Sequence, residues 1–350
     1  MNARQFVALG MAGSAAIAAM RYVQRNSRRM NFAGSSIVLT GASRGLGLVL
    51  ARQLAAQGAR LTLLARSSDE LQGAAEQLRA LGAEPLTIPC DVGVQGEVHA
   101  AIEQAAAHYG RIDVLINNAG IVSVGPIDHM TEADFEQAMR THFWGPLHAT
   151  LAALPHMRRQ GSGRIVNVSS IGGKVGVPHL VPYSASKFAL VGLSDGLRAE
   201  LAQENIRVTT VCPGLMRTGS CFNAQFRGRH EKEFAWFALS DSLPGLSINA
   251  ERAAAQIIDA CRHGDPYLVI STQARAADIV NTVFPGITAD VMAIVNRWLP
   301  QATDAGGNRT KTGWQSRSPL APSPLLGLSL AAAEANNGTA AARFAAAETP

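Results

Sequence analysis

Residues 182–187 place a phenol and an ammonium group four residues apart, at Tyr183 and Lys187, in a segment with the pattern of a helix. Residues at this spacing share one helical face, so the two side chains should be neighbours. A phenol with a pKa of about 10 exchanges protons poorly at neutral pH, but a nearby cation favours phenolate. The pair could therefore act in general acid/base catalysis. Tyr-x-x-x-Lys also arises by chance in helices, and an exposed pair without chemistry is the alternative.

Ser170 stands thirteen residues before Tyr183, just after a strand-like run. A hydroxyl in this position can hydrogen-bond a substrate carbonyl and the phenol together. A turn serine is the alternative, which the combination with Tyr183 and Lys187 weakens.

The elements that must position these side chains follow from the hydrophobic pattern. From residue 35 onward, short β-branched runs alternate with longer amphipathic runs, which predicts a parallel sheet with helices on both faces. The predicted strands are residues 36–40, 60–65, 84–89, 114–117, 163–168, 207–212 and 266–270. We therefore expect an α/β fold, with one doubly wound, seven-stranded domain over residues 35–300.

A glycine-rich turn, residues 40–47, joins the first predicted strand to a helical run. Glycines let the backbone turn tightly and approach a pyrophosphate, which the helix N-terminus can hold. A purely structural turn is the alternative, but the strand–turn–helix context favours a dinucleotide site. The turn residues expected to bind are Gly41, Ser43, Arg44, Gly45, Leu46 and Gly47.

The end of the second predicted strand indicates the choice of cofactor. In NAD-binding proteins it usually carries an acidic residue that holds the ribose 2′-hydroxyl. Here it reads Leu-Ala-Arg-Ser, with Arg66 where a carboxylate would stand. Arg66 and Arg44 could pair with a 2′-phosphate, which favours NADP(H). For each arginine, a solvated surface charge is the alternative.

Polar residues also follow the third and fourth predicted strands. Asp91, followed by Val92, could accept from an adenine amino group, or it could be a turn or N-cap residue. The run Asn117-Asn118-Ala119-Gly120 ends the fourth strand, at the edge where open α/β sheets bind ligands. Joining strand ends is the other role expected for at least one asparagine.

The ordered set of residues 40–47, 117–120, Ser170, Tyr183, Lys187 and 213–214 resembles the short-chain dehydrogenase/reductase family. The resemblance covers about residues 35–270 and implies a Rossmann-type oxidoreductase. It implies that Tyr183 is the catalytic acid/base, that Lys187 lowers the pKa of Tyr183 and holds the nicotinamide ribose, and that Ser170 polarises the substrate carbonyl. The other implied cofactor contacts are Asp91 with adenine, Asn117 on the adenosine side, Thr218 with the carboxamide, and Val92, Ala119, Gly120, Pro213 and Gly214.

One position departs from the family pattern. The family usually has an asparagine twenty-eight residues before the catalytic serine, where it helps to hold a proton-relay water, and this chain has His142. An imidazole can also order water, and it titrates near neutrality. A satisfied core histidine is the alternative. We expect retained activity with a pH profile that is sensitive to His142.

The predicted reaction is NADP(H)-dependent hydride transfer between the nicotinamide and a carbonyl or secondary alcohol of an apolar substrate. A lid over about residues 215–248 contains five aromatic residues that could line an apolar pocket, form the lid's own core or build a dimer contact. They are Phe222, Phe226, Phe234, Trp236 and Phe237. The alternatives are a 3-oxoacyl-thioester reductase and a non-catalytic NADP(H)-binding sensor or scaffold. The family also implies a homodimer or homotetramer.

Composition and the chain ends add further expectations. The net charge of +5 comes without a basic run interleaved with aromatics, which argues against nucleic acid, and the four cysteines do not have metal-site spacing. Residues 6–20 are uncharged and precede Arg21, Arg25, Arg28 and Arg29. We expect residues 1–34 to tether a cytoplasmic protein to a membrane, with a signal peptide or a surface helix as alternatives. Residues 274–300 are predicted as a helical extension and 301–350 as a largely disordered tail.

Overall fold

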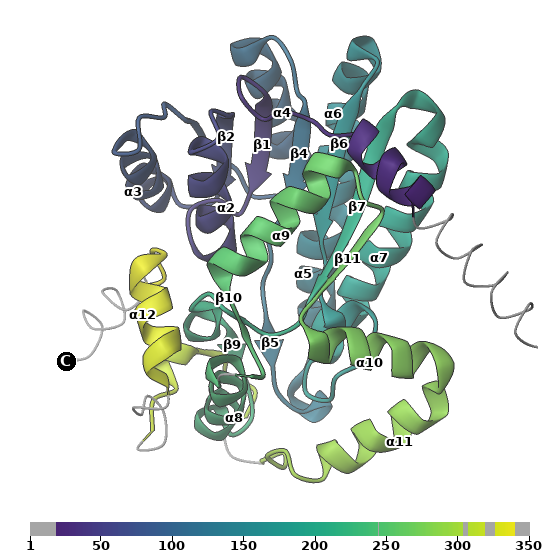
Figure 1. Cartoon of the computed structure of the whole chain (residues 1–350). Coiled ribbons are helices and arrows are strands. Elements are labelled where there is room, and N and C mark those ends of the chain that lie inside the picture. Colours follow the sequence, from purple (N-terminus) through teal and green to yellow (C-terminus); the bar gives the residue numbers. More distant parts are fainter. Residues whose placement is uncertain (1–18, 244, 304–306, 319–325, 340–350) are drawn as a thin grey trace, which may run out of the picture.

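The computed structural model describes residues 19–243, 245–303, 307–318 and 326–339. Its centre is a parallel sheet of seven strands in the order β11-β7-β6-β4-β1-β2-β3 (Figure 1). The strands are β1 Ser36–Thr40, β2 Arg60–Ala65, β3 Leu86–Pro89, β4 Val114–Asn117, β6 Gly163–Val168, β7 Ile206–Pro213 and β11 Tyr267–Ile270. This confirms the predicted seven-stranded α/β domain.

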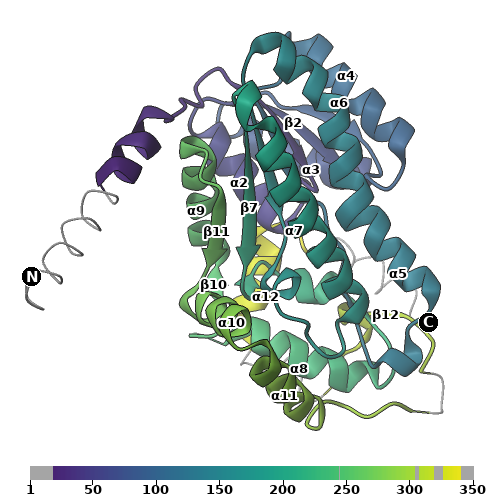
Figure 2. The same ribbon diagram turned by 90° about the vertical axis from the view of Figure 1, so that its right-hand side faces the viewer.

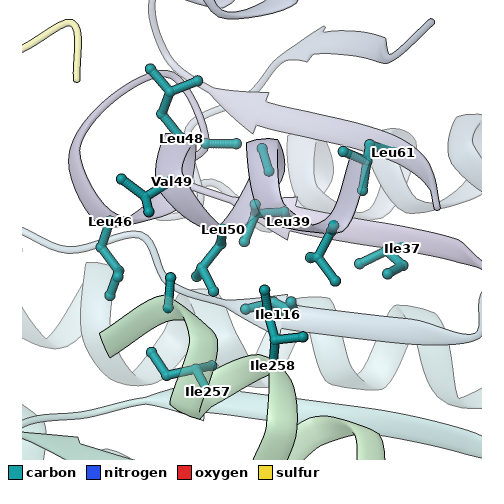
Figure 3. Close-up of a cluster of buried hydrophobic side chains, with 14 of the residues drawn as sticks. Ile37, Leu39, Leu46, Leu48, Val49, Leu50, Leu61, Ile116, Ile257 and Ile258 are labelled. Atoms are coloured by element: carbon teal, nitrogen blue, oxygen red, sulfur yellow. The ribbon is translucent and has the colours of Figure 1, made fainter. Parts of the chain in front are cut away.

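Three helices cover each face of the sheet (Figure 2). One face carries α2 Gly45–Ala55, α3 Ser68–Arg79 and α9 Ala250–His263, and the other carries α4 Gln95–Tyr109, α6 Gly145–Gln160 and α7 Val181–Leu201. The first layer is held by aliphatic side chains from both the strands and the helices. Leu39 of β1, Leu50 of α2 and Ile257 of α9 are fully buried there (Figure 3). Burying such a side chain stabilises the fold by about 1.5–3 kcal/mol.

The order of the strands reverses between β1 and β4. From β1 the chain proceeds to β2 and β3 on one side, and from β4 to β6, β7 and β11 on the other. In open α/β sheets, ligands bind outside the carboxyl ends of the strands at such a reversal. The glycine-rich turn follows β1, and the asparagine pair lies at the end of β4, so both lie at this edge.

Additional elements gather below the carboxyl edge (Figure 1). They are β5 Ser123–Val124, β8 Met216–Arg217, β9 Gln225–Phe226, α8 His230–Ser242, β10 Ile248–Asn249, α10 Thr272–Val283, α11 Pro285–Asn296, β12 Lys311–Thr312 and α12 Gly327–Ala335. Helices α10 and α11 lie in the segment predicted as a helical extension. They and the residues that follow them leave large apolar side chains in solvent, among them Ile279, Phe284, Ile287 and Trp298.

Helix α5 Glu132–Met139 runs into a π-helical turn, Arg140–Trp144, and then into α6. A π-turn carries one more residue than an α-helical turn, and such turns often occur at functional sites. This one contains His142, whose side chain is 1% exposed.

The amino-terminal segment is described from residue 19, so most of the apolar run at 6–20 lies outside the described residues. Residues 19–27 are helical. Arg25 forms ion pairs with Asp259, which lies in α9, and with Asp265 (2.8 Å), which follows α9. One predicted basic residue thus contacts the domain itself. Among the described residues, no helix is long and apolar enough to cross a membrane.

The prediction of a disordered tail is wrong for residues 307–318 and 326–339. Strand β12 pairs with β9, and Trp314 stacks on Phe222 with 4.6 Å between ring centroids. Leu326 and Ala333 are fully buried among lid residues. The tail lacks helical periodicity, so its own sequence does not reveal these partners, which lie about ninety residues earlier in the chain.

Candidate active site

A cavity of about 750 Å³ lies at the carboxyl edge of the sheet, where the strand order reverses. The glycine-rich turn, the ends of β2 and β3, helix α7 and the segment after β7 contribute to its walls. Most of the predicted site residues line it: Gly41, Ser43, Arg44, Gly45, Leu46, Gly47, Arg66, Asp91, Val92, Ala119, Gly120, His142, Tyr183, Lys187 and Thr218.

The glycine turn is shaped by close backbone contacts. A Cβ on Gly47 would lie 2.1 Å from the carbonyl oxygen of Gly41, and a Cβ on Gly41 would lie 2.7 Å from Ala119 Cα. Gly41 also has a φ of +64°, which disfavours other residues. No side chain caps the start of α2, so its N-terminus is presented to the cavity without a polar side chain in front of it. This arrangement fits a dinucleotide phosphate.

Tyr183 and Lys187 line the cavity, whereas Ser170 is not among the lining residues and lies beside the Tyr183 ring. The Ser170 hydroxyl accepts from the N–H of Gly172 (3.0 Å), and the Tyr183 ring lies beside the same glycine. The ammonium of Lys187 lies 5.7 Å from the centroid of the Tyr183 ring and donates to the carbonyl oxygen of Val168 (2.9 Å). Ser169 donates to the Lys187 carbonyl (3.0 Å), which fixes α7 against the end of β6. The sheet edge and one helix therefore hold the three groups together.

The pKa of Tyr183 differs from the expectation. Burial raises the pKa of the phenol above its usual value of 10, and the hydrogen bond from Ser170 opposes that rise. Burial also lowers the pKa of Lys187 to about 8. Burial penalises the charged form of each group, so the phenol pKa is raised although the Lys187 ammonium lies nearby.

His142 has partners on both ring nitrogens. Nε2 accepts from the backbone N–H of Ile121 (3.1 Å), and Nδ1 lies 2.8 Å from the hydroxyl of Ser186. Ser186 in turn donates to the carbonyl of Tyr183 (2.8 Å), and the two rings of His142 and Tyr183 meet edge to face. These contacts use both nitrogens, so the structure favours the positioned core histidine over a residue that orders water.

Three predicted cofactor residues do not line the cavity. The Asn117 amide donates to the side chain of Asn167 (2.8 Å) inside the sheet, and its contact with the adenosine side stays a prediction. The N–H of Gly214 donates to the carbonyl oxygen of Ile270 (3.0 Å), and Pro213 ends β7. The sequence correctly predicts that these three residues lie near strand ends. It does not predict which way each side chain points, because that depends on the strand pairing.

Asn118 does line the cavity, and its amide donates to the carbonyls of Thr40 (3.0 Å) and Gly41 (3.1 Å). It thereby joins the ends of β1 and β4, the structural role expected for at least one asparagine of the pair.

Glu70 was missed by the sequence interpretation. Its carboxylate accepts from Ser43 Oγ (2.9 Å) and pairs with Arg44 Nη1 (2.9 Å) beside the glycine turn. The signal was the Ser67-x-x-Glu70 pattern of a helix start, and Ser67 does accept from the Glu70 N–H (3.2 Å). Sequence alone did not show that the Glu70 side chain turns toward the cavity.

The lid aromatics form a core of their own. Phe222, Phe226 and Phe234 are at most 1% exposed and contact one another through ring pairs 5.5–5.7 Å apart. Phe237 is also buried, whereas Trp236 donates to the buried carboxylate of Glu233 (2.7 Å). Of the three roles left open for these residues, the structure supports the lid core. The cavity is instead lined by residues next to them in sequence, Ser220, Asn223, Ala224 and Gln225.

A doubly wound sheet whose glycine turn, tyrosine and lysine line one cavity, with a serine beside the tyrosine, defines an oxidoreductase that binds a dinucleotide. The family model described as short chain dehydrogenase matches residues 35–225. The chain belongs to the short-chain dehydrogenase/reductase family, whose members bind small-molecule substrates and use a nicotinamide cofactor.

Relatives support this assignment. The chain is 32% identical over 276 residues to the Drosophila melanogaster dehydrogenase/reductase SDR family protein 7-like, covering 77% of this chain and 83% of the relative. It is 39% identical over 181 residues to the ketoacyl reductase HetN of Nostoc, covering 52% of this chain and 63% of the relative. The crystal structure of a short-chain type dehydrogenase/reductase from Mycobacterium marinum is similar, with a TM-score of 0.59, 29% identity, and coverage of 69% of this chain and 94% of that one.

Proposed function

We propose that the protein is an NADP(H)-dependent oxidoreductase that acts on a carbonyl or secondary alcohol of an apolar substrate, with Tyr183 as the acid/base. The observation that carries this proposal is that Tyr183 and the buried Lys187 line the same cavity as the glycine turn, with Ser170 beside the Tyr183 ring. A scaffold without catalysis would not need these three groups to converge.

The chain's own residues would divide the work. The glycine turn and α2 N-terminus hold the phosphates, and Lys187 lies where it can hold the nicotinamide ribose while Val168 orients its ammonium. The bound nicotinamide supplies or accepts the hydride. In the reductive direction the Tyr183 phenol donates its proton to the substrate oxygen, and the Ser170 hydroxyl hydrogen-bonds the same oxygen and stabilises its developing charge. The raised pKa of Tyr183 keeps this proton on the phenol until it is needed.

Arginine side chains support the preference for NADP(H). Arg66 is exposed and lines the cavity, and no side-chain partner is found for it among the described residues. Arg44 lies on the same side and is paired with Glu70. Two guanidinium groups near the adenosine end would favour a 2′-phosphate.

An apolar substrate is supported by the wall near the lid. Ile121, Val122, Met216 and Ala224 line the cavity, and Tyr183 packs partly against the lid core. A 3-oxoacyl thioester is the second candidate, because the relative HetN is named a ketoacyl reductase. Only the second class carries a thioester and a carrier group, so a panel of substrates with and without these groups can separate the two.

The test is a comparison of the wild type with Tyr183→Phe. NADPH and NADH are titrated by fluorescence, and turnover is measured on bulky apolar ketones and 3-oxoacyl thioesters. We expect tighter binding of NADPH, and a loss of activity of at least about 100-fold in Tyr183→Phe with the NADPH affinity kept. NADPH binding without turnover of either substrate class in the wild type would contradict the proposal.

We also propose a cytoplasmic homodimer or homotetramer that contacts a membrane through its amino-terminal segment. The apolar side chains that α10 and α11 expose, such as Ile279 and Ile287, support a further apolar contact. Sedimentation of the full chain tests the assembly, and flotation with lipid vesicles tests the membrane contact. A monomer that stays with the vesicle-free fraction would contradict both expectations.

A further inference from the structure

The last described part of the chain crosses the mouth of the cofactor cavity. We call residues 327–338, which comprise α12 and the turn after it, the carboxyl-terminal strap. The N–H of Gly45, the first residue of α2, donates to the carbonyl oxygen of Asn336 (2.9 Å). The Asn337 amide donates to the carbonyl of Ser43 (3.2 Å), and Gly338 lines the cavity itself. The strap therefore contacts the glycine turn at two of its residues.

The strap also contacts the opposite wall. The Asn223 amide donates to the carbonyl of Gly338 (3.1 Å). Gly219, with a φ of +77°, lies so close to α12 that a Cβ there would be 2.5 Å from Ala333 Cα. Gly219 directly follows Thr218, which lines the cavity. The strap thus bridges the glycine turn and the start of the lid (Figure 1).

Two side chains outside the cavity anchor the strap. Arg52, on α2, donates to the carbonyl of Ala335 (3.0 Å) and to the side chain of Asn336. Gln77, on α3, donates to the side-chain oxygen of Asn337 (2.7 Å). Neither Arg52 nor Gln77 lines the cavity, so these contacts can be removed without altering its walls.

The bond to Gly45 places a carbonyl oxygen where the start of α2 would meet an anion. An N–H at a helix N-terminus that already donates to a carbonyl is not available to a phosphate oxygen, and the two oxygens would repel each other. The helix has no side-chain cap, so the strap satisfies a group that a nucleotide would otherwise satisfy.

We propose that the carboxyl-terminal strap is an intramolecular gate that competes with the dinucleotide for the glycine turn. The proposal rests on the proposed nucleotide-dependent function. Binding of the dinucleotide requires that residues 336–338 leave Gly45 and Ser43. Molecules with the strap bound to the glycine turn cannot bind the dinucleotide. They therefore lower its apparent affinity in proportion to their population.

The first test removes the anchors in the full-length chain. Arg52→Ala combined with Asn337→Ala deletes bonds on the strap and spares the lid core. We expect NADPH to bind about three- to tenfold more tightly than in the wild type, because the open fraction rises. Arg79→Ala, which removes an arginine on α3 that pairs with Glu84, is the matched control and should leave the affinity unchanged. Unchanged or weaker binding in the double variant would overturn the gate.

A second measurement follows the strap directly in the wild type. Hydrogen–deuterium exchange over residues 327–338 should become faster with saturating NADP⁺, because the strap is released. Slower exchange would mean that the strap clamps over the nucleotide, and either slower or unchanged exchange overturns the gate. If no variant binds NADPH or NADH, the proposed function falls together with the gate. Normal nucleotide binding with unchanged exchange refutes the gate alone.

Discussion

His142 and Ser186 are joined by a hydrogen bond of 2.8 Å between Nδ1 and Oγ, inside the contact between the π-turn and α7. Since Nε2 accepts from the Ile121 N–H, the ring proton must lie on Nδ1. Burial, and then the charge of Lys187, lower the pKa of His142 well below 6.5. The imidazole is therefore neutral in the folded protein near neutral pH, and it positions Tyr183 through Ser186.

This assignment predicts a pH dependence of stability. The unfolded chain protonates His142 below about pH 6.5, whereas the folded protein resists that proton, so the unfolded state gains protons as the pH falls. The free energy of unfolding should be highest above about pH 6.5 and should fall by up to about 1.4 kcal/mol per pH unit below it. In His142→Asn, the free energy of unfolding measured by urea denaturation should fall less steeply below this pH. The exposed His108→Asn is the control, and an equal decrease in wild type and His142→Asn would contradict the assignment.

Lys187 should set a limb of the pH–rate profile. Burial lowers the pKa of Lys187 to about 8, so the ammonium is present below that pH and is lost above it. Reductive kcat/KM should therefore fall as the pH rises through about 8. Lys187→Met should lose at least about 100-fold of activity at every pH, while the exposed Lys232→Met should keep the wild-type profile. A flat wild-type profile between about pH 7 and 9 would be the contrary result.

Glu70 should weaken the preference for NADP(H). Its carboxylate pairs with Arg44 at 2.9 Å, so it offsets the charge that a 2′-phosphate would meet. In Glu70→Gln the side chain can still accept from Ser43, but the negative charge is gone. We expect NADPH to bind about three- to tenfold more tightly with little change for NADH. Glu84→Gln, an exposed partner of Arg79, is the control. A parallel change for both nucleotides would argue for a general structural effect.

Gly47 should tolerate no side chain. A Cβ there would lie 2.1 Å from Gly41 O, and backbone cannot move away cheaply. Gly47→Ala should lower the free energy of unfolding by more than about 3 kcal/mol and impair nucleotide binding. Gly96→Ala is the control, because no atom lies within 4 Å of its Cβ position on α4. It should be neutral or stabilise by up to about 1 kcal/mol. Equal thermal stability of the two variants would contradict the close packing of the turn.

The sheet was readily predicted because its signal is local. Each buried strand is a short β-branched run, and β1, β2, β4 and β6 begin and end at the predicted residues. Strand β3 begins two residues later than predicted, at Leu86, after a turn that the pattern does not distinguish from a strand. The folded tail could not be predicted, because Trp314 is buried by Phe222, a residue far away in the chain.

The sequence predicted most of the residues that form the site, but it did not predict their pKa values or ion pairs. Most predicted residues line one cavity, since the carboxyl ends of parallel strands share one edge. The raised pKa of Tyr183 and the pairing of Glu70 with Arg44 depend on burial and side-chain direction, which spacing does not encode. Asn117 shows the same limit, because one step along a strand turns a side chain to the other face.

Because of the π-turn at residues 140–144, this region should tolerate substitutions better than insertions or deletions. Helix α5, the π-turn and α6 form one continuous helical stretch from Glu132 to Gln160. Because a π-turn carries one more residue than an α-helical turn, deleting a single residue within it would restore a regular α-helix and remove the bulge that contains His142. Natural variants of this segment should therefore differ by substitution and should rarely gain or lose a residue.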